Sequence, residues 1–378
     1  MGNSVSNRRS KYRTNNGEPL STTQPGPPPT TKTPSVGQSP NLPKLPKMKA
    51  TAPPYPKADS TLRALASQAE GFGRSAIGGL HGALYHVTTL ADDGPGSLRD
   101  GCRRKEPLWI VFDLSGTVEL RSIMNVNSFK TIDGRGQRIK ITDKGIRLQK
   151  CEHVIICNLE FEGGKGSDVD AIQIKPHSKH VWIDRCSLSN YADGLVDITR
   201  ESTDITISRC RFSQHNKTIL IGADPSHVGD KRIRVTIHHC FFDGTVQRHP
   251  RVRFAKVHLY NNYTRNWGIY AVCASVKSQI FSECNIYEAG EKSVSFLYYK
   301  EKAGCEEECT GYLHSEGDWF VGNTKSGLGI GQCGESGGSF HPGDFYGDWT
   351  VEAPTEVLKQ YLQHSTGWQS LPLPPDNQ

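Results

Sequence analysis

Long apolar runs are absent from this chain of 378 residues, of which 35% are apolar. No stretch approaches the roughly 20 apolar residues that a helix needs to cross a bilayer. The opening MGNSVSNRRSKYR has no apolar segment after its charges, so the pattern does not predict a secretory signal. Thirty-eight glycines indicate instead a turn-rich, soluble chain with enough apolar residues for one large domain or two ordinary ones.

Acidic residues are scarce at the start of the chain. Residues 1–57 hold nine Lys or Arg against Glu18 alone, a net charge of +8, which leaves −2 for the remainder. A nearly neutral body argues against nucleic-acid binding, because nucleic-acid-binding domains are usually basic over a whole face. Residues 1–57 also hold twelve prolines and few aliphatic residues. We therefore expect this segment to be a disordered basic tail.

The tail carries a possible address signal. Gly2 and Ser6 fit the N-myristoylation pattern, and an ordinary polar tail fits them as well. One acyl chain binds membranes weakly, and the basic residues 8–13 would add attraction to anionic lipids. The pattern predicts an intracellular or membrane-associated protein with weak membrane contact through the tail. We expect the chain to be a monomer.

Paired cysteines are not predicted either. The chain has eleven cysteines, an odd number, with no secretory signal in front of them. This pattern favours free thiols in a reducing compartment over a disulfide framework.

One short pattern recurs through the middle of the chain. Six segments place an aliphatic or aromatic residue three positions before a Cys or Asn: VIICNLEF, VWIDRCSL, ITISRCRF, VTIHHCFF, VHLYNNYT and QIFSECNI. The aligned positions are Asn158, Cys186, Cys210, Cys240, Asn262 and Cys284. Intervals of 22 to 30 residues, with strand-like alternation and no helical periodicity between the segments, are typical of a solenoid.

The repeats predict an all-β fold, a parallel β-helix with three strands per coil. The aligned Cys and Asn side chains would stack coil upon coil as an internal ladder of small, inert groups. The β-helix domain would span 58–378. Its open ends would be covered by an N-terminal cap in 68–107 and by a capping segment from about 305. Apolar spacing further predicts helices in 60–73 and 355–368.

Two acidic pairs lie between the repeats. Asp168 and Asp170 point the same way if they lie in a strand, and a turn would let Asp193 and Asp197 converge. The pairs are 25 residues apart, close to one coil, which would stack them about 4.8 Å apart. Four carboxylates on one patch need a cation, and hard oxygen ligands at this density suit calcium. Salt bridges to nearby bases, or aspartates placed at turns, explain the pattern equally well.

Basic residues follow on the next coils. Lys217 comes first, and Arg248, Arg251 and Arg253 then fall within six positions around Pro250. An arginine is almost never buried without a partner, so carboxylates of the chain or an acidic ligand must neutralise this charge. A cation held by aspartates beside Lys and Arg would bind a polymer that carries carboxylates.

These motifs resemble the plant-type branch of the pectate lyase family. The similarity runs from GFGRSAIGGLHGALYHVTTLADDGPGSLRDG through NSFKTIDGRG, VWIDRCSLSNYADGLVDI, HNKTILIG and QRHPRVR to about residue 290. It covers well over half of the chain, and the R-x-P-x-x-R element at 248–253 is its most specific part.

The resemblance implies a right-handed parallel β-helix that cleaves polygalacturonate (de-esterified pectin) by calcium-dependent β-elimination, giving unsaturated oligogalacturonides. The calcium ligands that it implies are Asp168, Asp170, Asp193 and Asp197. It also implies that Lys217 and Arg253 bind a substrate carboxylate and that Arg248 is the catalytic base. Guanidinium groups in general hold their proton strongly, so an arginine base predicts activity that rises above pH 8.

The chain also departs from the family pattern. Arg185 stands in WIDR where family members usually have His, which predicts altered packing without loss of chemistry. Family members are usually secreted, so the cell wall is the alternative location. Two other functions remain open. The chain could be a non-catalytic acidic-polysaccharide or membrane-associated binding protein on this scaffold, or a hydrolase that uses the aspartates as general acid and base.

Overall fold

The computed structural model describes residues 59–66, 68–304, 306–326 and 340–376. The expectations of a disordered tail in 1–57 and of acylation at Gly2 concern residues outside these ranges. Eight of the described cysteines are buried free thiols, as the odd count favoured: Cys102, Cys151, Cys157, Cys186, Cys210, Cys240, Cys273 and Cys284.

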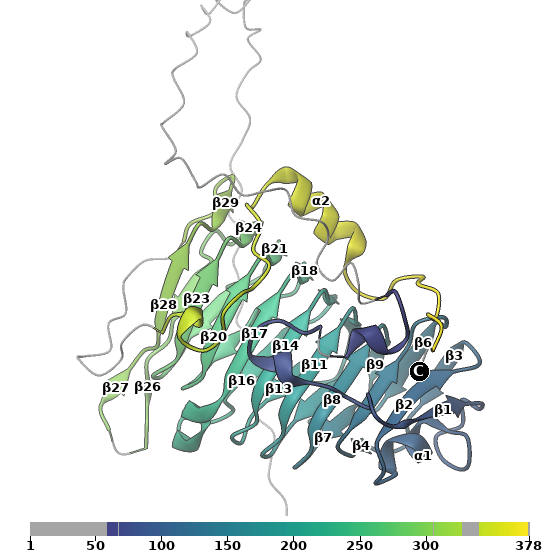
Figure 1. Ribbon diagram of the computed structural model, residues 1–378. Helices are drawn as coiled ribbons and strands as arrows, with labels where there is room; N and C mark the ends of the chain where they lie inside the picture. The colour runs from purple at the N-terminus through teal and green to yellow at the C-terminus, as the bar shows by residue number, and fades with distance from the viewer. Residues whose placement is uncertain (1–58, 67, 305, 327–339, 377–378) are drawn as a thin grey trace, which may run out of the picture. The chain divides into compact units, whose positions relative to one another are not determined.

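The described residues form a parallel β-helix of three sheets, which confirms the predicted fold class (Figure 1). Sheet A consists of β1 (Ala83–Val87), β2 (Leu108–Phe112), β5 (Lys130–Asp133), β8 (Glu152–Cys157), β11 (Lys179–Asp184), β14 (Thr203–Ser208), β17 (Arg234–His238), β20 (Lys256–Tyr260), β23 (Gln279–Glu283) and β28 (Tyr312–Glu316). Sheet B consists of β3 (Gly116–Glu119), β6 (Ile139–Asp143), β9 (Glu160–Gly164), β12 (Ser187–Ser189), β15 (Arg211–Ser213), β18 (Phe241–Asp243), β21 (Tyr263–Arg265), β24 (Ile286–Glu288) and β29 (Trp319–Val321). Sheet C consists of β4 (Met124–Val126), β7 (Ile146–Leu148), β10 (Ile172–Ile174), β13 (Gly194–Ile198), β16 (Lys217–Ile221), β19 (Arg251–Val252), β22 (Val272–Ala274) and β25 (Phe296–Tyr298).

Stacked aliphatic side chains fill the interior of the coils. In sheet A the six strands from β8 to β23 each place a β-branched residue over the one before it, in a row of Val154, Val181, Ile205, Val235, Val257 and Ile280. All six are almost fully buried. Because side chains alternate along a strand, the residues between them point outward and are free to carry other chemistry. The core therefore fixes which side chains reach each outer face.

The internal ladder is present, but the sequence alignment placed its first and last members, Asn158 and Cys284, one residue too early. Cys186 and Cys210 are neighbours in it, since the Cys186 N–H donates to Cys210 Sγ at 3.4 Å. It continues through Cys240 and Asn262 to Asn285, whose Oδ1 accepts from the Asn262 N–H at 2.8 Å.

Asn158 and Cys284 lie one position earlier, in the turn. Their φ angles are 58° and 50°, and Arg185, Arg209 and His239 share this left-handed turn position. A one-residue shift moves a side chain between the interior and the turn, and the Cys/Asn pattern alone does not fix the shift.

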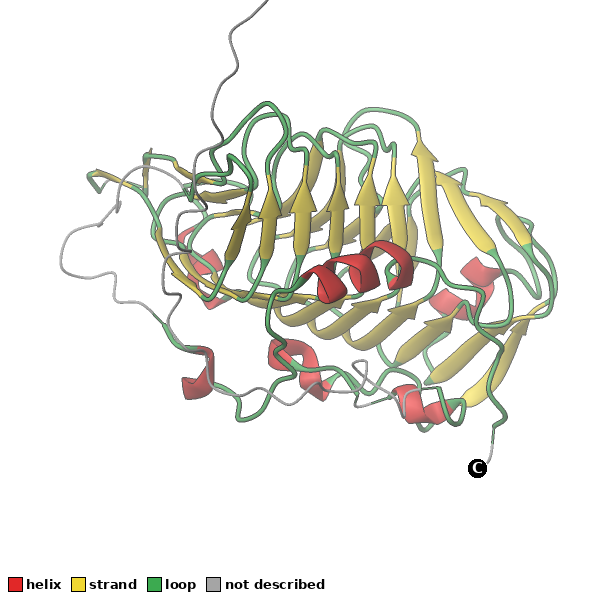
Figure 2. Cartoon of the chain, turned by 90° about the horizontal axis from the view of Figure 1, so that it is seen from above, coloured by secondary structure: helices red, strands yellow, loops and turns green. Residues whose placement is uncertain are grey.

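The two predicted helices have different outcomes. The C-terminal one forms as α2 (Glu356–Ser365), with Thr355 accepting the Leu358 N–H as its N-cap. Leu358 and Leu362 pack on the outer face of sheet B beside Phe241 and Tyr263, so α2 lies across the strands (Figure 2).

The helix expected over 60–73 was wrong. The segment holds only η1 (Arg63–Leu65) and η2 (Gly71–Ser75), two 3-10 turns. The N–H groups of Phe72 and Gly73 donate to Thr236 and Thr206 of sheet A. These tertiary bonds replace the helical ones. None of the described helices is long and apolar enough to span a membrane.

The remaining short elements lie at the ends and edges of the coils. They are α1 (Leu98–Arg103), η3 (Val228–Arg232), η4 (Pro342–Asp344) and an antiparallel hairpin of β26 (Glu301–Lys302) and β27 (Glu308–Cys309). Leu98 and Cys102 of α1 are fully buried in the main core, beside the first strands. Sheets A and B continue past 305 through β28 and β29, so the chain there still adds strands to the coils.

Arg185 is accommodated by a partner from the start of the described chain. Its guanidinium forms two bonds of 2.8 Å with the carboxylate of Asp59, and its side chain is only 10% exposed. This ion pair ties the N-terminal segment to the turn between sheets A and B, and the predicted effect of Arg185 on packing and chemistry stays a prediction.

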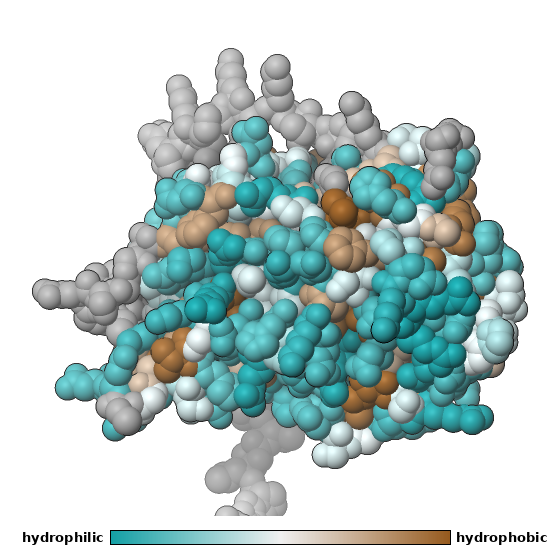
Figure 3. Space-filling model, turned by 60° about the horizontal axis from the view of Figure 1, so that its bottom comes forward, coloured by the Kyte–Doolittle hydropathy of each residue, from teal (hydrophilic) through white to brown (hydrophobic). Residues whose placement is uncertain are grey.

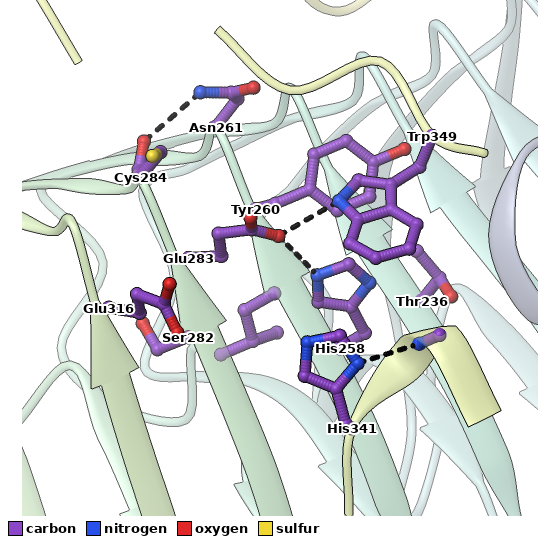
Figure 4. Close-up of polar contacts among 12 residues, drawn as sticks. Thr236, His258, Tyr260, Asn261, Ser282, Glu283, Cys284, Glu316, His341 and Trp349 are labelled. Carbon is purple, nitrogen blue, oxygen red and sulfur yellow. Dashed lines mark hydrogen bonds and ion pairs between the residues drawn. The ribbon is translucent and has the colours of Figure 1, made fainter. Parts of the chain in front are cut away.

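A polar network holds the C-terminal segment on sheet A (Figure 4). His258 Nδ1 lies 2.6 Å from the Tyr346 hydroxyl, and its Nε2 lies 3.1 Å from Glu283 Oε2. The same carboxylate oxygen accepts the Trp349 Nε1–H at 2.8 Å, and His341 lies beside the ring of His258. The buried imidazole is therefore part of the attachment of residues 340–352.

Buried histidines make this fold sensitive to acid. Burial lowers the pKa of His238 and of His258, and it lowers the pKa of His249 to about 3. Between these values and the ordinary 6.5, the unfolded chain binds more protons than the folded chain. The contribution of these groups to stability is therefore complete above pH 6.5 and is lost as the pH falls below it.

We expect the free energy of unfolding to fall below pH 6.5 by up to about 1.4 kcal/mol per pH unit for each of these histidines. Urea unfolding at pH 7.5, 6.5 and 5.5 measures the slope. His258→Asn should flatten it, whereas His364→Asn, at an exposed position of α2, should not. An unchanged slope in His258→Asn would contradict this account.

Candidate active site

The candidate site lies on the outer face of sheet C. Register places Gln173 of β10 beside Asp197 of β13, and Asp197 beside Leu220 of β16. Leu220 in turn pairs with Arg251 of β19. Because Ile172 and Ile174 point into the core, Gln173 and its partners form an outward row. Figure 3 turns the side of Figure 1 that carries the labels β4, β7, β13 and β16 forward and shows a mostly hydrophilic surface.

Asp170 and Asp197 converge around Gly194. The Gly194 N–H donates to Asp170 Oδ1 at 2.6 Å, and Gln173 Nε2 donates to Asp170 Oδ2 at 2.8 Å. A β-carbon on Gly194 would lie 2.7 Å from Asp170 Oδ1 and 3.1 Å from Asp197 Oδ1. The two carboxylates thus enclose a space that a methyl group would fill. We call Asp170, Asp197 and Gly194 the carboxylate cradle.

It is electrostatically unfavourable for both carboxylates of the cradle to be ionised without a cation. Burial, and then the charge of Asp170, raise the pKa of Asp197 to about 8. Burial also raises the pKa of Asp170, against the hydrogen bonds from Gln173 and Gly194. The positive charges of Lys175 and Arg248 act on Asp197 in the opposite direction. A pair of carboxylates with raised pKa values either takes up a proton or binds a cation.

The other two predicted ligands do not close on the cradle. Asp193 Oδ1 accepts from Lys217 Nζ at 2.5 Å, and Asp168 is exposed at the border of a neighbouring cleft. Among the described residues, no three His, Cys, Asp or Glu side chains converge as a metal cluster. The set of four ligands stays a prediction, of which the structure brings Asp170 and Asp197 together.

Two of the three crowded arginines are neutralised by one glutamate. Glu301 of β26 accepts from Arg251 Nη2 at 3.0 Å and from Arg253 Nη2 at 2.7 Å. Arg253 Nε also donates to Glu301 at 2.8 Å. The aromatic ring of Tyr299 lies 4.7 Å from the Arg251 guanidinium carbon. The hairpin of β26 and β27 thus supplies the carboxylate that these arginines require.

Arg253 is held more tightly than its predicted role suggests. Its Nη1 donates to the carbonyls of Gly222 and Ala223 at 3.0 Å, and its side chain is 10% exposed. A substrate carboxylate could reach this guanidinium only by sharing or displacing these bonds. The assignment of Arg253 to carboxylate binding stays a prediction.

Arg248 differs from its two neighbours. It forms no ion pair with a carboxylate of the described residues, and its Nε is buried without a hydrogen-bond partner. Its backbone has a φ of 67°, in the left-handed region, at the turn that leads into β19. Its charge acts on Asp197, so it lies near the cradle. Within the described ranges, Arg248 is therefore the arginine of the three that forms no ion pair.

Sequence reasoning missed Gln173, Lys175 and Glu301. Gln173 joins Asp170 to Arg147, whose Nε donates to Gln173 Oε1 at 2.8 Å. Lys175 acts electrostatically on both cradle carboxylates. Counting back one coil from Asp197 leads to Gln173. Strand alternation then adds Lys175, two positions later, so the sequence could have identified both. No sequence signal points to Glu301, because a hairpin 48 residues after Arg253 brings it back.

Comparisons with known proteins identify the family. A family model described as pectate lyase matches residues 117–305. Probable pectate lyase 4 of Arabidopsis thaliana is 42% identical over 250 residues, which cover 64% of this chain and 68% of the relative. Putative pectate lyase 21 of the same plant is 38% identical over 278 residues, 68% of this chain and 71% of the relative.

The chain belongs to the pectate lyase family. Among solved structures, jun a 1, the major allergen from cedar pollen, has a TM-score of 0.72 at 31% identity and covers 83% of this chain and 96% of its own. A pectate lyase from Bacillus sp. N165, in complex with trigalacturonate, has a TM-score of 0.64 at 23% identity and covers 79% and 98%. The second likeness shows the fold alone. Membership confirms the expected enzyme class, a polysaccharide lyase.

We expect Glu301→Gln to lower the free energy of unfolding by about 2–5 kcal/mol, because it leaves two largely buried arginines without a carboxylate. Urea unfolding measures this change. Glu306→Gln on the same hairpin is the control, since its partner Lys277 and Glu306 itself are both at the surface. The control should lose less than about 1 kcal/mol. Equal losses in the two variants would contradict the neutralising role of Glu301.

Proposed function

We propose that this lyase cleaves polygalacturonate by calcium-dependent β-elimination and releases unsaturated oligogalacturonides. The observation that carries the proposal is the carboxylate cradle with raised pKa values, next to Arg248, for which the described residues supply no carboxylate partner. Family membership supports pectate as the substrate. The trigalacturonate bound by the Bacillus enzyme is consistent with an acidic sugar polymer.

The residues present fit calcium. Asp170 and Asp197 offer hard carboxylate oxygens, and burial, followed by the charge of Asp170, raises the pKa of Asp197, a cost that a bound cation would offset. Asp193 and Asp168 would complete the oxygen ligands, with Asp193 exchanging its bond to Lys217 for the cation. When bound, calcium would neutralise the substrate carboxylate and stabilise negative charge that develops beside it.

The chain's own residues account for the elimination. Arg248 in its neutral form removes the proton from carbon 5 of a galacturonate, alpha to the carboxylate. The electron pair forms the double bond between carbons 4 and 5, and the bond from carbon 4 to the glycosidic oxygen breaks. The leaving oxygen takes up a proton from water. Lys217 pairs with the substrate carboxylate and stabilises the enolate-like transition state, with Arg253 as the second candidate.

A spectroscopic assay with and without a chelator tests the proposal. With polygalacturonate and calcium, the ultraviolet absorbance of unsaturated uronides should rise, and more steeply above pH 8, because alkaline pH favours a neutral arginine. A chelator should stop the rise. Reducing ends without ultraviolet absorbance would indicate a hydrolase. Binding without cleavage would indicate a carbohydrate-binding protein, and either result would overturn the proposal.

Arg248→Lys should lower kcat by about 10²- to 10⁴-fold, the usual contribution of a general base. Binding of polygalacturonate, measured by calorimetry, should change little, because a positive charge remains at the position. Arg138→Lys, an exposed arginine paired with Glu160 next to sheet B, is the matched control and should keep normal turnover. Normal turnover in Arg248→Lys would remove Arg248 from the role of base.

A further inference from the structure

A polar cleft adjoins the carboxylate cradle. It has a volume of about 870 Å³ and lies where the chain leaves the strands β7, β10 and β13. Asp168 lies in its lining, and the loop that contains His227 and η3 forms its opposite wall. Its volume falls within the range of about 300–1,000 Å³ that is typical of ligand sites, so it can hold more than an isolated carboxylate.

Cations from three successive coils line this cleft. Lys150 follows β7, Lys175 follows β10 and Arg200 follows β13. Backbone bonds hold the three turns together: the Lys175 N–H donates to Leu148 and the Lys150 N–H donates to Pro176, at 2.9 and 2.8 Å. The His177 N–H donates to the Arg200 carbonyl at 2.9 Å. Successive coils are about 4.8 Å apart, and the register places Lys175 one position before the level of Lys150 and Arg200, so the three cations form a short, staggered ladder along the cleft.

The ladder carries positive charge that the described chain does not neutralise. Lys150, Lys175 and Arg200 form no ion pair with any carboxylate of the described residues. Of the acids that line the cleft, Glu201 is paired with Arg232 at 3.1 Å. Asp230 is buried and accepts the Glu201 N–H, and burial raises the pKa of its carboxyl. Asp168 is therefore the exposed acid of this lining without a cationic partner.

Lys175 links the cleft to the cradle. It lines the cleft, and its charge also acts on Asp170 and Asp197. A polymer with one carboxylate on every sugar could therefore place one residue at the cradle and continue into the cleft. Each further carboxylate would meet a Lys or Arg instead of a metal ion.

We infer that Lys150, Lys175 and Arg200 form an accessory subsite for the carboxylates of uronate residues beyond the reacting bond. This subsite binds without calcium and selects chains that are free of methyl esters over several consecutive residues. The inference rests on the proposed function for its ligand. It assigns these three residues to substrate binding and not to the chemical step.

Charge-removing variants test the subsite. In Lys150→Gln and Arg200→Gln we expect the KM for polygalacturonate to rise about three- to tenfold, the range between an exposed ion pair and a charge-assisted hydrogen bond. We expect kcat at saturation to stay within about twofold, and the KM effect to shrink with trigalacturonate, which fills fewer positions. Arg138→Gln removes the same charge next to sheet B, and its KM should stay at the wild-type value. Circular dichroism checks that each variant is folded.

A binding experiment separates this inference from the proposed function. Affinity for polygalacturonate is measured by calorimetry with a chelator present, in the Arg248→Lys chain with and without Lys150→Gln and Arg200→Gln. A loss of affinity in the added variants supports the subsite even if the wild type shows no lyase activity. Unchanged affinity and unchanged KM overturn the subsite even if the wild type is active. An equal loss with fully methyl-esterified pectin also overturns it, because that polymer offers no carboxylates.

Discussion

The site depends on two carboxylates that the fold forces together. Asp170 and Asp197 come from adjacent coils and enclose the same small space at Gly194. As free anions in a buried place they repel each other, and the raised pKa of Asp197 expresses this cost. Lys175 and Arg248 relieve part of the repulsion from two sides. The remaining imbalance is what makes the cradle suited to a divalent cation.

The β-helix imposes this proximity through its repeat. Inward aliphatic residues lock the register of each coil, and alternation then fixes the outward residues. Arg147, Gln173, Asp197, Leu220 and Arg251 therefore fall in one row, although 104 positions separate the first from the last. On this face the acids Asp170 and Asp197 lie between Arg147 on the coil before them and Lys217 and Arg251 on the coils after them. The order of charges along the sequence thus becomes an order of charges in space.

The periodicity of the sequence made the fold and the face of the site predictable. The exact ladder positions, the N-terminal helix and the long-range ion pairs depend on local geometry that the sequence pattern does not reveal. The 22- to 30-residue intervals predict the coils, and one-coil spacing predicts that the aspartates meet on one face. The alignment failed at Asn158 and Cys284, because a left-handed turn residue precedes each ladder position and looks the same in sequence. The helix over 60–73 failed because threonines of sheet A capture its backbone. Long-range partners such as Glu301 leave no local signal.

The most direct measurement is calcium binding to Gly194→Ala by calorimetry. Gly194 does not need a left-handed backbone, so the added methyl group acts on the cradle, 2.7 Å from Asp170 Oδ1, and not on the chain path. The account predicts at least about tenfold weaker calcium binding, a loss of about 1.4 kcal/mol, with the unfolding temperature nearly unchanged. Gly347→Ala, whose added β-carbon would meet nothing within 4 Å, should bind calcium as the wild type does. Wild-type calcium affinity in Gly194→Ala would contradict the central claim that the cradle is the cation site.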